Sequence, residues 1–171
     1  MMIKNIVSYL ISCNYLRFIL VLYVFLFVFF ILPIEGIEYL FQIDSTQNNS
    51  IVHEIESFWV LLLVTIILGP VIETLVFQVF LIRAFIILGE ISFGDKTNRN
   101  TILIVSIFLA AAIFGVLHFY SVFYTVSAFI LGLYFGWIYY LCIQRKAHPF
   151  FAIFVIHALY NLTILGIEKW V

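Results

Sequence analysis

Apolar residues fill long uninterrupted stretches of this chain, and the polar residues are gathered into short segments between them. A helix needs roughly 20 residues to cross the hydrocarbon core of a bilayer, and five stretches are near or above that length. Residues 1–14 precede them as a short amphipathic lead-in. The predicted transmembrane helices are residues 15–32, 57–88, 101–119, 122–143 and 149–165.

Turn residues and charges set the predicted ends of these helices. Pro33 and Gly36 are predicted to stop the first one, and the acidic segment 35–56, which has no Lys or Arg, follows as a loop. Residues 89–100 carry charges of both signs and are predicted to form an aqueous loop. Pro149 suits the first turn of the last helix.

The second stretch, residues 57–88, is too long for a simple crossing. At 1.5 Å per residue it spans about 48 Å, against a hydrocarbon core of about 30 Å. Cutting it at Pro70 would leave a first piece too short to cross alone, so one long tilted or kinked helix is predicted. Pro70 cannot donate a hydrogen bond to the carbonyl of Ile66, which loosens the backbone one turn before Glu73.

The composition is that of a chain surrounded by lipid. The 171 residues are 65% hydrophobic and 10% charged, whereas soluble domains are about 45–50% apolar and about 25% charged. The apolar runs do not alternate as the strands of a membrane β-barrel do. The predicted fold class is therefore an all-α membrane protein with about five transmembrane helices. The net charge of -1 provides no basic patch, so nucleic acid is not an expected partner.

Lysine and arginine are distributed unevenly over the two sides of the predicted bundle. The cytoplasmic side of a membrane protein carries the excess of these residues. Their distribution predicts a cytoplasmic N-terminus, an outer C-terminus and an outer position for the acidic segment 35–56. The cytoplasmic set is Lys4, Arg17, Arg83, Lys96, Arg99, Arg145 and Lys146, and the outer residue is Lys169.

Glu73 is the first candidate for chemistry. Within residues 57–88 the only other ionisable side chain is Arg83. An ionisable group at membrane depth is costly, normally faces protein or water, and marks a functional site by default. Helical spacing places Glu73 on one face with Phe77 and Phe80, and so on an aromatic stripe of low dielectric constant.

Two histidines in equally apolar surroundings, His118 and His157, extend the candidate site. His157 and Asn161 are four residues apart and share a helical face. Peptide hydrolysis needs a base that activates water and donors that stabilise the oxyanion of the tetrahedral intermediate. Glu73 with His118 can activate a water, and His157 with Asn161 can donate two hydrogen bonds to one oxygen. These four residues form a candidate hydrolytic site without a Ser or Cys nucleophile.

Composition and spacing alone leave other interpretations open. An intramembrane glutamate can pair with a structural histidine or carry protons in a transporter. Glu73, His118 and His157 can also bind zinc, with a water as the fourth ligand, although the chain has no His-Glu-x-x-His motif. A peptidase and a small proton-coupled transporter are both compatible with these residues.

The segments around Glu73, His118 and His157, in this order, resemble motifs of the CPBP family. These are the CAAX protease and bacteriocin-processing enzymes, also called the Abi family. The family pattern is Glu-Glu-x-x-x-Arg, then Phe-x-x-x-His, then His-x-x-x-Asn, on successive transmembrane segments. The resemblance covers about residues 60–165. The matching residues are Glu73-Thr74-Leu75-Val76-Phe77-Gln78, Phe114 to His118, and His157 to Asn161.

The resemblance implies a helical bundle like that of CAAX prenyl proteases, with a role for each candidate residue. Glu73 would activate the water with help from His118, and His157 and Asn161 would form the oxyanion hole. No cofactor is expected, and zinc held by Glu73, His118 and His157 is the less favoured option in a family often labelled as metalloproteases.

Two residues depart from the family pattern. Thr74 replaces the second glutamate and Gln78 replaces the arginine. One charge of each sign is lost together, so no unpaired charge is left in the membrane. Thr74 and Gln78 are four apart and are placed to form a neutral hydrogen bond instead. At about 100° per residue, Gln78 lies about 140° around the helix from Glu73, away from the catalytic water.

The resulting hypothesis is an intramembrane endopeptidase of glutamate type. Residues 57–171 would form the catalytic transmembrane domain, and residues 1–56 the lead-in, first helix and acidic outer loop. The expected substrate is a peptide or protein at the membrane, with lipidated substrates among the options. The expected location is the bacterial inner (cytoplasmic) membrane.

A non-catalytic scaffold or bacteriocin-immunity protein of the same fold is the main alternative. Thr74 and Gln78 are the features that favour it. The transporter would need a relay of ionisable groups across the bilayer, and along its own helix Glu73 has only Arg83.

The predicted helix bounds place the two histidines at different depths. His118 falls near the outer end of its predicted helix. His157 falls eight residues after Pro149, the residue that begins the last helix on the inner side. At about 1.5 Å per residue these depths differ by more than about 10 Å. A tilted third helix, a later helix start or shifted bounds would bring the two together.

Overall fold

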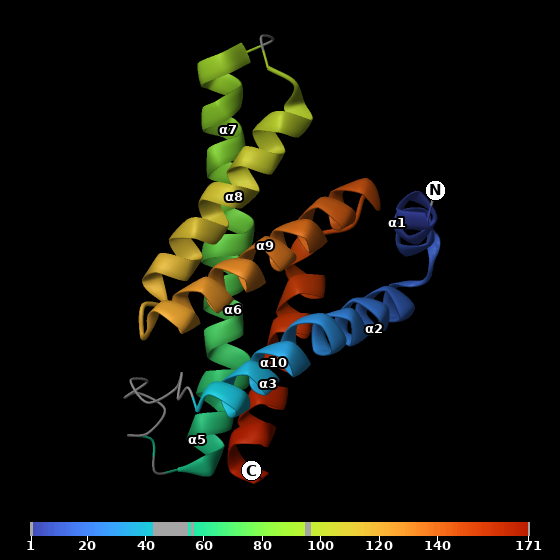
Figure 1. Ribbon diagram of the computed structural model, residues 1–171. Helices are drawn as coiled ribbons and strands as arrows, with labels where there is room; N and C mark the ends of the chain where they lie inside the picture. Colours follow the sequence, from blue (N-terminus) through green and yellow to red (C-terminus); the bar gives the residue numbers. More distant parts are fainter. Residues whose placement is uncertain (1, 43–54, 56, 95–96, 171) are drawn as a thin grey trace.

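The computed structural model describes residues 2–42, 55, 57–94 and 97–170. Within this part of the chain all regular structure is helical, and five helices are long and apolar enough to cross a membrane. A long helix and the C-terminal helix run beside each other, and the other long helices cross them obliquely (Figure 1). The predicted all-α fold is confirmed, and the protein is an integral membrane protein.

The first crossing is longer than predicted. The prediction that Pro33 and Gly36 end it is wrong, because the helix continues through both residues to Phe41. Pro33 follows a π-helical turn, and local adjustments of this kind let membrane helices accommodate a proline. Glu35 is therefore helical, and most of the predicted acidic loop, residues 43–54 and 56, lies outside the described residues. The elements are α1 (Met2–Ser12), α2 (Tyr15–Leu26), the π-helical η1 (Phe27–Ile31) and α3 (Leu32–Phe41).

One continuous helix runs from Phe58 to Phe93, as predicted for a single long span, but it passes the predicted end at Leu88. Its backbone is π-helical both before and after the short α-helical segment that contains Pro70. Such π-helical turns are rare in proteins, and many of those that occur are found at functional sites. The parts of this helix are α5 (Phe58–Leu62), η2 (Leu63–Leu68), α6 (Gly69–Glu73), η3 (Thr74–Leu81) and α7 (Ile82–Phe93).

Three further helices complete the bundle. Gly132 and Gly136 allow two of them to pack closely, because a Cβ on Gly132 would lie 3.1 Å from the Cα of Ala111. Small residues four apart let membrane helices approach closely in this way. These helices are α8 (Arg99–Leu117), α9 (Val122–Gln144) and α10 (Pro149–Trp170). The first two lie within two residues of the predicted bounds, and α10 passes its predicted end at Leu165 by five residues.

Arg145 fastens helix α1 to the bundle. Its guanidinium donates hydrogen bonds to the carbonyl oxygens of Leu10 and Cys13, the second at 2.8 Å, and lies 4.5 Å from the centre of the Phe18 ring. The last carbonyls of a helix have no partner within it, so the arginine supplies donors that the end of α1 lacks. The predicted amphipathic lead-in is therefore a docked helix.

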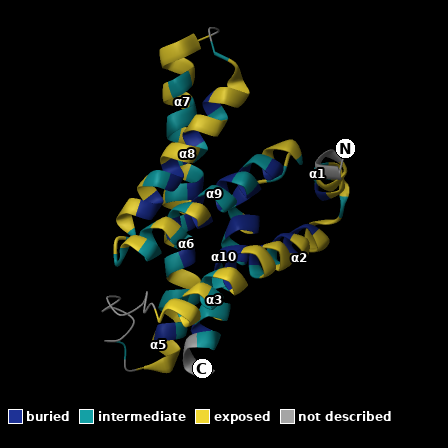
Figure 2. Ribbon diagram, in the orientation of Figure 1, coloured by how far each residue is buried: buried dark blue, intermediate teal, exposed yellow. Residues whose placement is uncertain are grey.

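Buried and outward-facing positions are equally apolar. Buried side chains such as Phe18, Phe135 and Ile153 form the core between α2, α9 and α10, and the outer faces of the helices are exposed (Figure 2). Large apolar residues such as Leu20 and Phe108 are among those exposed. Helices in lipid show this pattern because the surrounding hydrocarbon is as apolar as the core.

Candidate active site

Three segments that are far apart in the sequence bring Glu73, His118 and His157 to one point. Oε2 of Glu73 lies 3.6 Å from Nε2 of His118 and 3.5 Å from Nε2 of His157. The glutamate ends α6, the first histidine follows α8, and the second lies on α10. The structure therefore assembles these three predicted residues, and their chemical roles remain predictions.

The oblique course of α8 removes the depth difference predicted for the two histidines. α8 crosses the long helix at an angle (Figure 1). Its bounds, Arg99–Leu117, differ from the predicted ones by only two residues at each end. Tilt, and not a large error in the bounds, brings His118 level with His157.

His118 is held in place by the backbone at the end of α8. It is the residue after the last helical turn, and its N–H donates to the carbonyl of Gly115 at 3.1 Å. The ring Nδ1 lies 2.7 Å from the carbonyl oxygen of Phe114. Because a carbonyl can only accept, Nδ1 carries a proton. In the neutral ring, Nε2 therefore presents a lone pair toward Glu73.

His157 is buried among aromatic rings. Its ring centre lies 4.9 Å from that of Phe135 and 6.5 Å from that of Phe114. Its Nδ1 has no hydrogen-bond partner. Buried N–H groups without an acceptor are rare, so the proton of the neutral ring belongs on Nε2. This places an N–H donor, and not a lone pair, on the side that faces Glu73.

Glu73 keeps partial access to the surroundings. Its side chain is 29% exposed, whereas that of His157 is 4% exposed. A Cβ at Gly69, one turn earlier, would lie 3.8 Å from Oε1 of Glu73 and 3.2 Å from the carbonyl oxygen of Val64. The glycine is therefore a direct neighbour of the carboxylate, and a side chain at this position would lie against it.

Asn161 is turned toward the backbone of the long helix. Its Nδ2 donates a hydrogen bond to the carbonyl oxygen of Thr65 at 2.8 Å. The N–H of Gly69 is bonded to the carbonyl of Val64, five residues back. The next donor in that π-helical register would be Pro70, which has no N–H. Asn161 thus replaces a missing backbone donor, and the second N–H of its amide is not used by this bond.

Thr65 is the residue of this region that sequence reasoning missed. The prediction placed the carbonyl freed by Pro70 at Ile66, which holds for α-helical i→i−4 hydrogen bonds. In the π-helical register the partner lies five residues back, at Thr65. The proline was a visible signal that a carbonyl would be freed, but no residue pattern indicated the register.

The predicted aromatic stripe beside Glu73 is only half correct. The Phe77 ring packs edge-on against that of Phe114 at 5.4 Å between centres, and the Phe114 ring also lies 4.2 Å from that of His118. Phe80, by contrast, is 68% exposed. It lies in η3, where π-helical bonding changes the rotation per residue, so positions seven apart no longer share a face.

Thr74 and Gln78, the two departures from the family pattern, are fully buried. The hydroxyl of Thr74 and both polar atoms of the Gln78 amide have no hydrogen-bond partner. The neutral hydrogen bond predicted between them is therefore not formed. Buried polar groups without partners carry a desolvation cost.

Replacing Gln78 by methionine is expected to raise the stability of the protein. The exchange removes two buried polar atoms without partners at similar side-chain length, and each such group costs about 1–3 kcal/mol. The midpoint of denaturant-induced unfolding in detergent measures the effect. Tyr134→Phe is the matched control and should be destabilising, because the Tyr134 hydroxyl donates to the carbonyl of Leu22 at 2.6 Å. A less stable Gln78→Met protein would show that the amide has a partner.

Metal-ligating residues are sparse in the part of the chain that the structure describes. There, no group of three His, Cys, Asp or Glu side chains is arranged to hold a metal ion.

A cavity of about 370 Å³ lies between α7 and α8, and none of its lining residues belongs to the cluster around Glu73.

A comparison with known families gives one match. The family model described as Type II CAAX prenyl endopeptidase Rce1-like matches residues 55–163, which is more than half of the chain and includes all four candidate residues. No curated protein and no solved structure gives a significant match.

Proposed function

The chain belongs to the Rce1-like family of type II CAAX prenyl endopeptidases, and from that premise we propose that it hydrolyses peptide bonds with a water activated by Glu73. His118, His157 and Asn161 complete the proposed site. The proposal rests on one observation: the same carboxylate oxygen of Glu73 lies close to an imidazole nitrogen of both His118 and His157.

The distances around Glu73 favour a water as the reacting group. At 3.5 and 3.6 Å the nitrogens are beyond ordinary hydrogen-bond lengths, so neither imidazole is tightly bonded to the carboxylate, and a water can bind beside the three groups. The carboxylate and the Nε2 lone pair of His118 are both acceptors, so they repel each other unless a donor joins them. A water that donates one hydrogen to each has its own lone pairs free for attack.

The proposed reaction follows from these donor and acceptor positions. The water oxygen attacks the peptide carbonyl carbon, and Glu73 takes the proton that the water loses. The carbonyl oxygen becomes an oxyanion, and the Nε2–H of His157 and the second N–H of Asn161 donate to it. When the C–N bond breaks, Glu73 returns the proton to the leaving amine, which restores the carboxylate.

We propose that this chemistry proceeds without a metal ion. A histidine that ligates a metal almost always donates its other ring N–H to an acceptor. If His157 bound zinc through Nε2, its proton would lie on Nδ1, which is buried and has no acceptor. The set formed by Glu73, His118 and His157 therefore does not fit a zinc site.

The substrate is proposed to be a peptide that reaches the site from the membrane, with a lipidated C-terminus as the first candidate because of the family to which the chain belongs. The proposed setting is the bacterial inner membrane with the N-terminus in the cytoplasm, in line with the bias of Lys and Arg.

Cleavage by the purified protein tests the proposal. The full chain in proteoliposomes is given a fluorogenic peptide that ends in a farnesylated CAAX sequence, or the same peptide without the lipid. Hydrolysis of either peptide supports the peptidase, and a preference for the first supports lipid recognition. No hydrolysis of these or of a mixed peptide library would favour the non-catalytic scaffold, which the loss of the charged pair at Thr74 and Gln78 also suggests.

A further inference from the structure

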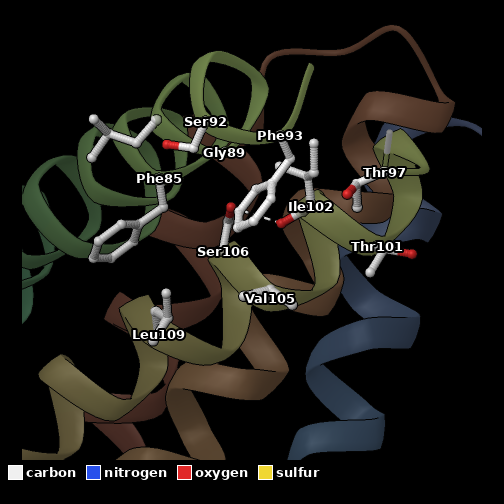
Figure 3. A pocket seen from close by; sticks show the side chains of 11 residues that line it. Phe85, Gly89, Ser92, Phe93, Thr97, Thr101, Ile102, Val105, Ser106 and Leu109 are labelled. Atoms are coloured by element: carbon white, nitrogen blue, oxygen red, sulfur yellow. Dashed lines mark hydrogen bonds between the residues drawn. The ribbon is translucent and has the colours of Figure 1, made fainter. Parts of the chain in front are cut away.

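The cavity between α7 and α8 is a second site, separate from the cluster around Glu73. It has a volume of about 370 Å³ and is lined by residues on both sides of the turn that joins the two helices (Figure 3). Its deepest residue on α7, Phe85, lies twelve residues after Glu73, or about 18 Å along the helix. A volume of this size is within the range of small-molecule sites, about 300–1,000 Å³.

The lining of the cavity changes in polarity along its length. Hydroxyl groups of Ser92, Thr97 and Thr101 lie near the turn, whereas Phe85 and Leu109 lie about two helical turns deeper. The deeper hydroxyl of Ser106 is already bonded to the carbonyl of Ile102 at 2.8 Å. The inner part of the cavity is therefore apolar, and free hydroxyls are confined to the end at the turn.

Gly89 defines one wall of the cavity. A Cβ at this position would lie only 2.6 Å from Cγ2 of Ile102, so the two helices touch here and both residues contribute to the lining. The cavity is thus bounded by a close helix contact.

The cavity lies between two helices of the membrane-spanning part of the chain. Both helices that line it are parts of membrane-spanning segments, Phe58–Phe93 and Arg99–Leu117. The turn end carries an exposed ion pair in which Nε of Arg99 lies 3.4 Å from Oε1 of Glu90. The bias of Lys and Arg places this end at the cytoplasmic leaflet, which is rich in anionic lipids.

We propose that the cavity binds one acyl chain of an anionic membrane phospholipid. The chain lies against Phe85 and Leu109, the ester and glycerol oxygens meet the hydroxyls near the turn, and the phosphate lies beside the exposed guanidinium of Arg99. The lining changes from apolar groups to hydroxyls, and Arg99, paired with Glu90, lies two residues before Thr101 and outside the lining. This order matches that of hydrocarbon, ester and phosphate in such a lipid. This site does not depend on the proposed peptidase activity.

Photolabelling of the full chain in proteoliposomes tests the site. The probe is a phosphatidylglycerol with a diazirine in its acyl chain, and a phosphatidylcholine with the same chain is the comparison. We expect labels to concentrate on peptides 85–93 and 101–109. Val105→Trp should reduce labelling there by roughly tenfold, because an indole overfills the lined space, while Ile104→Trp, next to it but outside the lining, should not.

The charge of Arg99 and the contacts to the acyl chain are tested with separate variants. Arg99→Gln should remove the preference for the glycerol probe and leave labelling by the choline probe unchanged, whereas Arg83→Gln, also exposed and outside the lining, should change neither. Leu109→Phe provides a second filling variant in case Val105→Trp does not fold. Labels spread evenly over all lipid-facing helices, or labelling that both filling variants leave unchanged, would overturn the proposal. Equal labelling by both probes in the unmodified chain would overturn the role of Arg99.

Discussion

Replacing Glu73 by glutamine is expected to lower the rate of peptide hydrolysis by about 10²–10⁴ with little change in stability, because the amide has nearly the same shape but cannot take a proton from water. Among the residues that the structure describes, Glu73 is the carboxylate that lies within 3.6 Å of both histidine Nε2 atoms, so it is the base of the proposed reaction. Initial rates in proteoliposomes, compared at equal amounts of folded protein, measure the effect.

Glu90→Gln is the matched control for this prediction. Glu90 lies on the same continuous helix and is exposed, with Arg99 as its partner. Its removal should leave hydrolysis unchanged, because an exposed ion pair contributes little to stability. A Glu73→Gln protein that cleaves peptide at the normal rate would remove the glutamate from the mechanism. Equal losses in both variants would point to a general effect of charge in the long helix.

Replacing Asn161 by alanine is expected to lower hydrolysis by about 10²–10³, the usual cost of losing one oxyanion donor. The same change should also cost about 1–3 kcal/mol of stability, because the carbonyl of Thr65 loses its donor. Activity per folded protein and the unfolding midpoint in detergent are both measured, since one substitution is expected to alter the two quantities for different reasons.

Pro70→Ala separates the two roles of Asn161. The alanine has an N–H that, in the π-helical register, can donate to the carbonyl of Thr65. In the double variant Pro70→Ala/Asn161→Ala we expect stability to recover in part while hydrolysis stays low. If activity returns together with stability, Asn161 supports the backbone only and does not contact the oxyanion. Pro70→Ala alone shows how much the loss of the proline itself contributes.

The partial exposure of Glu73 bears on how a substrate would reach it. The two histidines approach the carboxylate from the end of α8 and from α10, and Gly69 lies beside its other oxygen. A larger residue at position 69 would narrow that side and would also press on the carbonyl of Val64.

Much of the architecture could be predicted from the sequence because it depends on the sum of many apolar residues. The spans and the continuity of the long helix past Pro70 followed from length and hydrophobicity alone. The helix ends were predicted less accurately. Pro33 was predicted to stop the first helix, but the helix continues through it to Phe41. A proline is compatible with either outcome, and the backbone around it decides which occurs.

The candidate residues could also be named from the sequence, because an acid and histidines in apolar helices stand out. Glu73, His118 and His157 were predicted together and lie together, but their distances and their proton positions were not predictable. Helical spacing also misplaced Phe80 and the carbonyl freed by Pro70, because a π-helical register cannot be recognised from residue types.

The sequence by itself determined that the chain lies in the membrane, roughly where its helices run, and which residues are candidates for its chemistry. The tertiary structure alone decided which helix faces are buried, how far α8 tilts, and that Asn161 meets Thr65. In water, apolar and polar faces reveal the inside of a helix, because only one of them avoids the solvent. In hydrocarbon both faces are apolar, so close packing and the pairing of a few backbone groups select the arrangement.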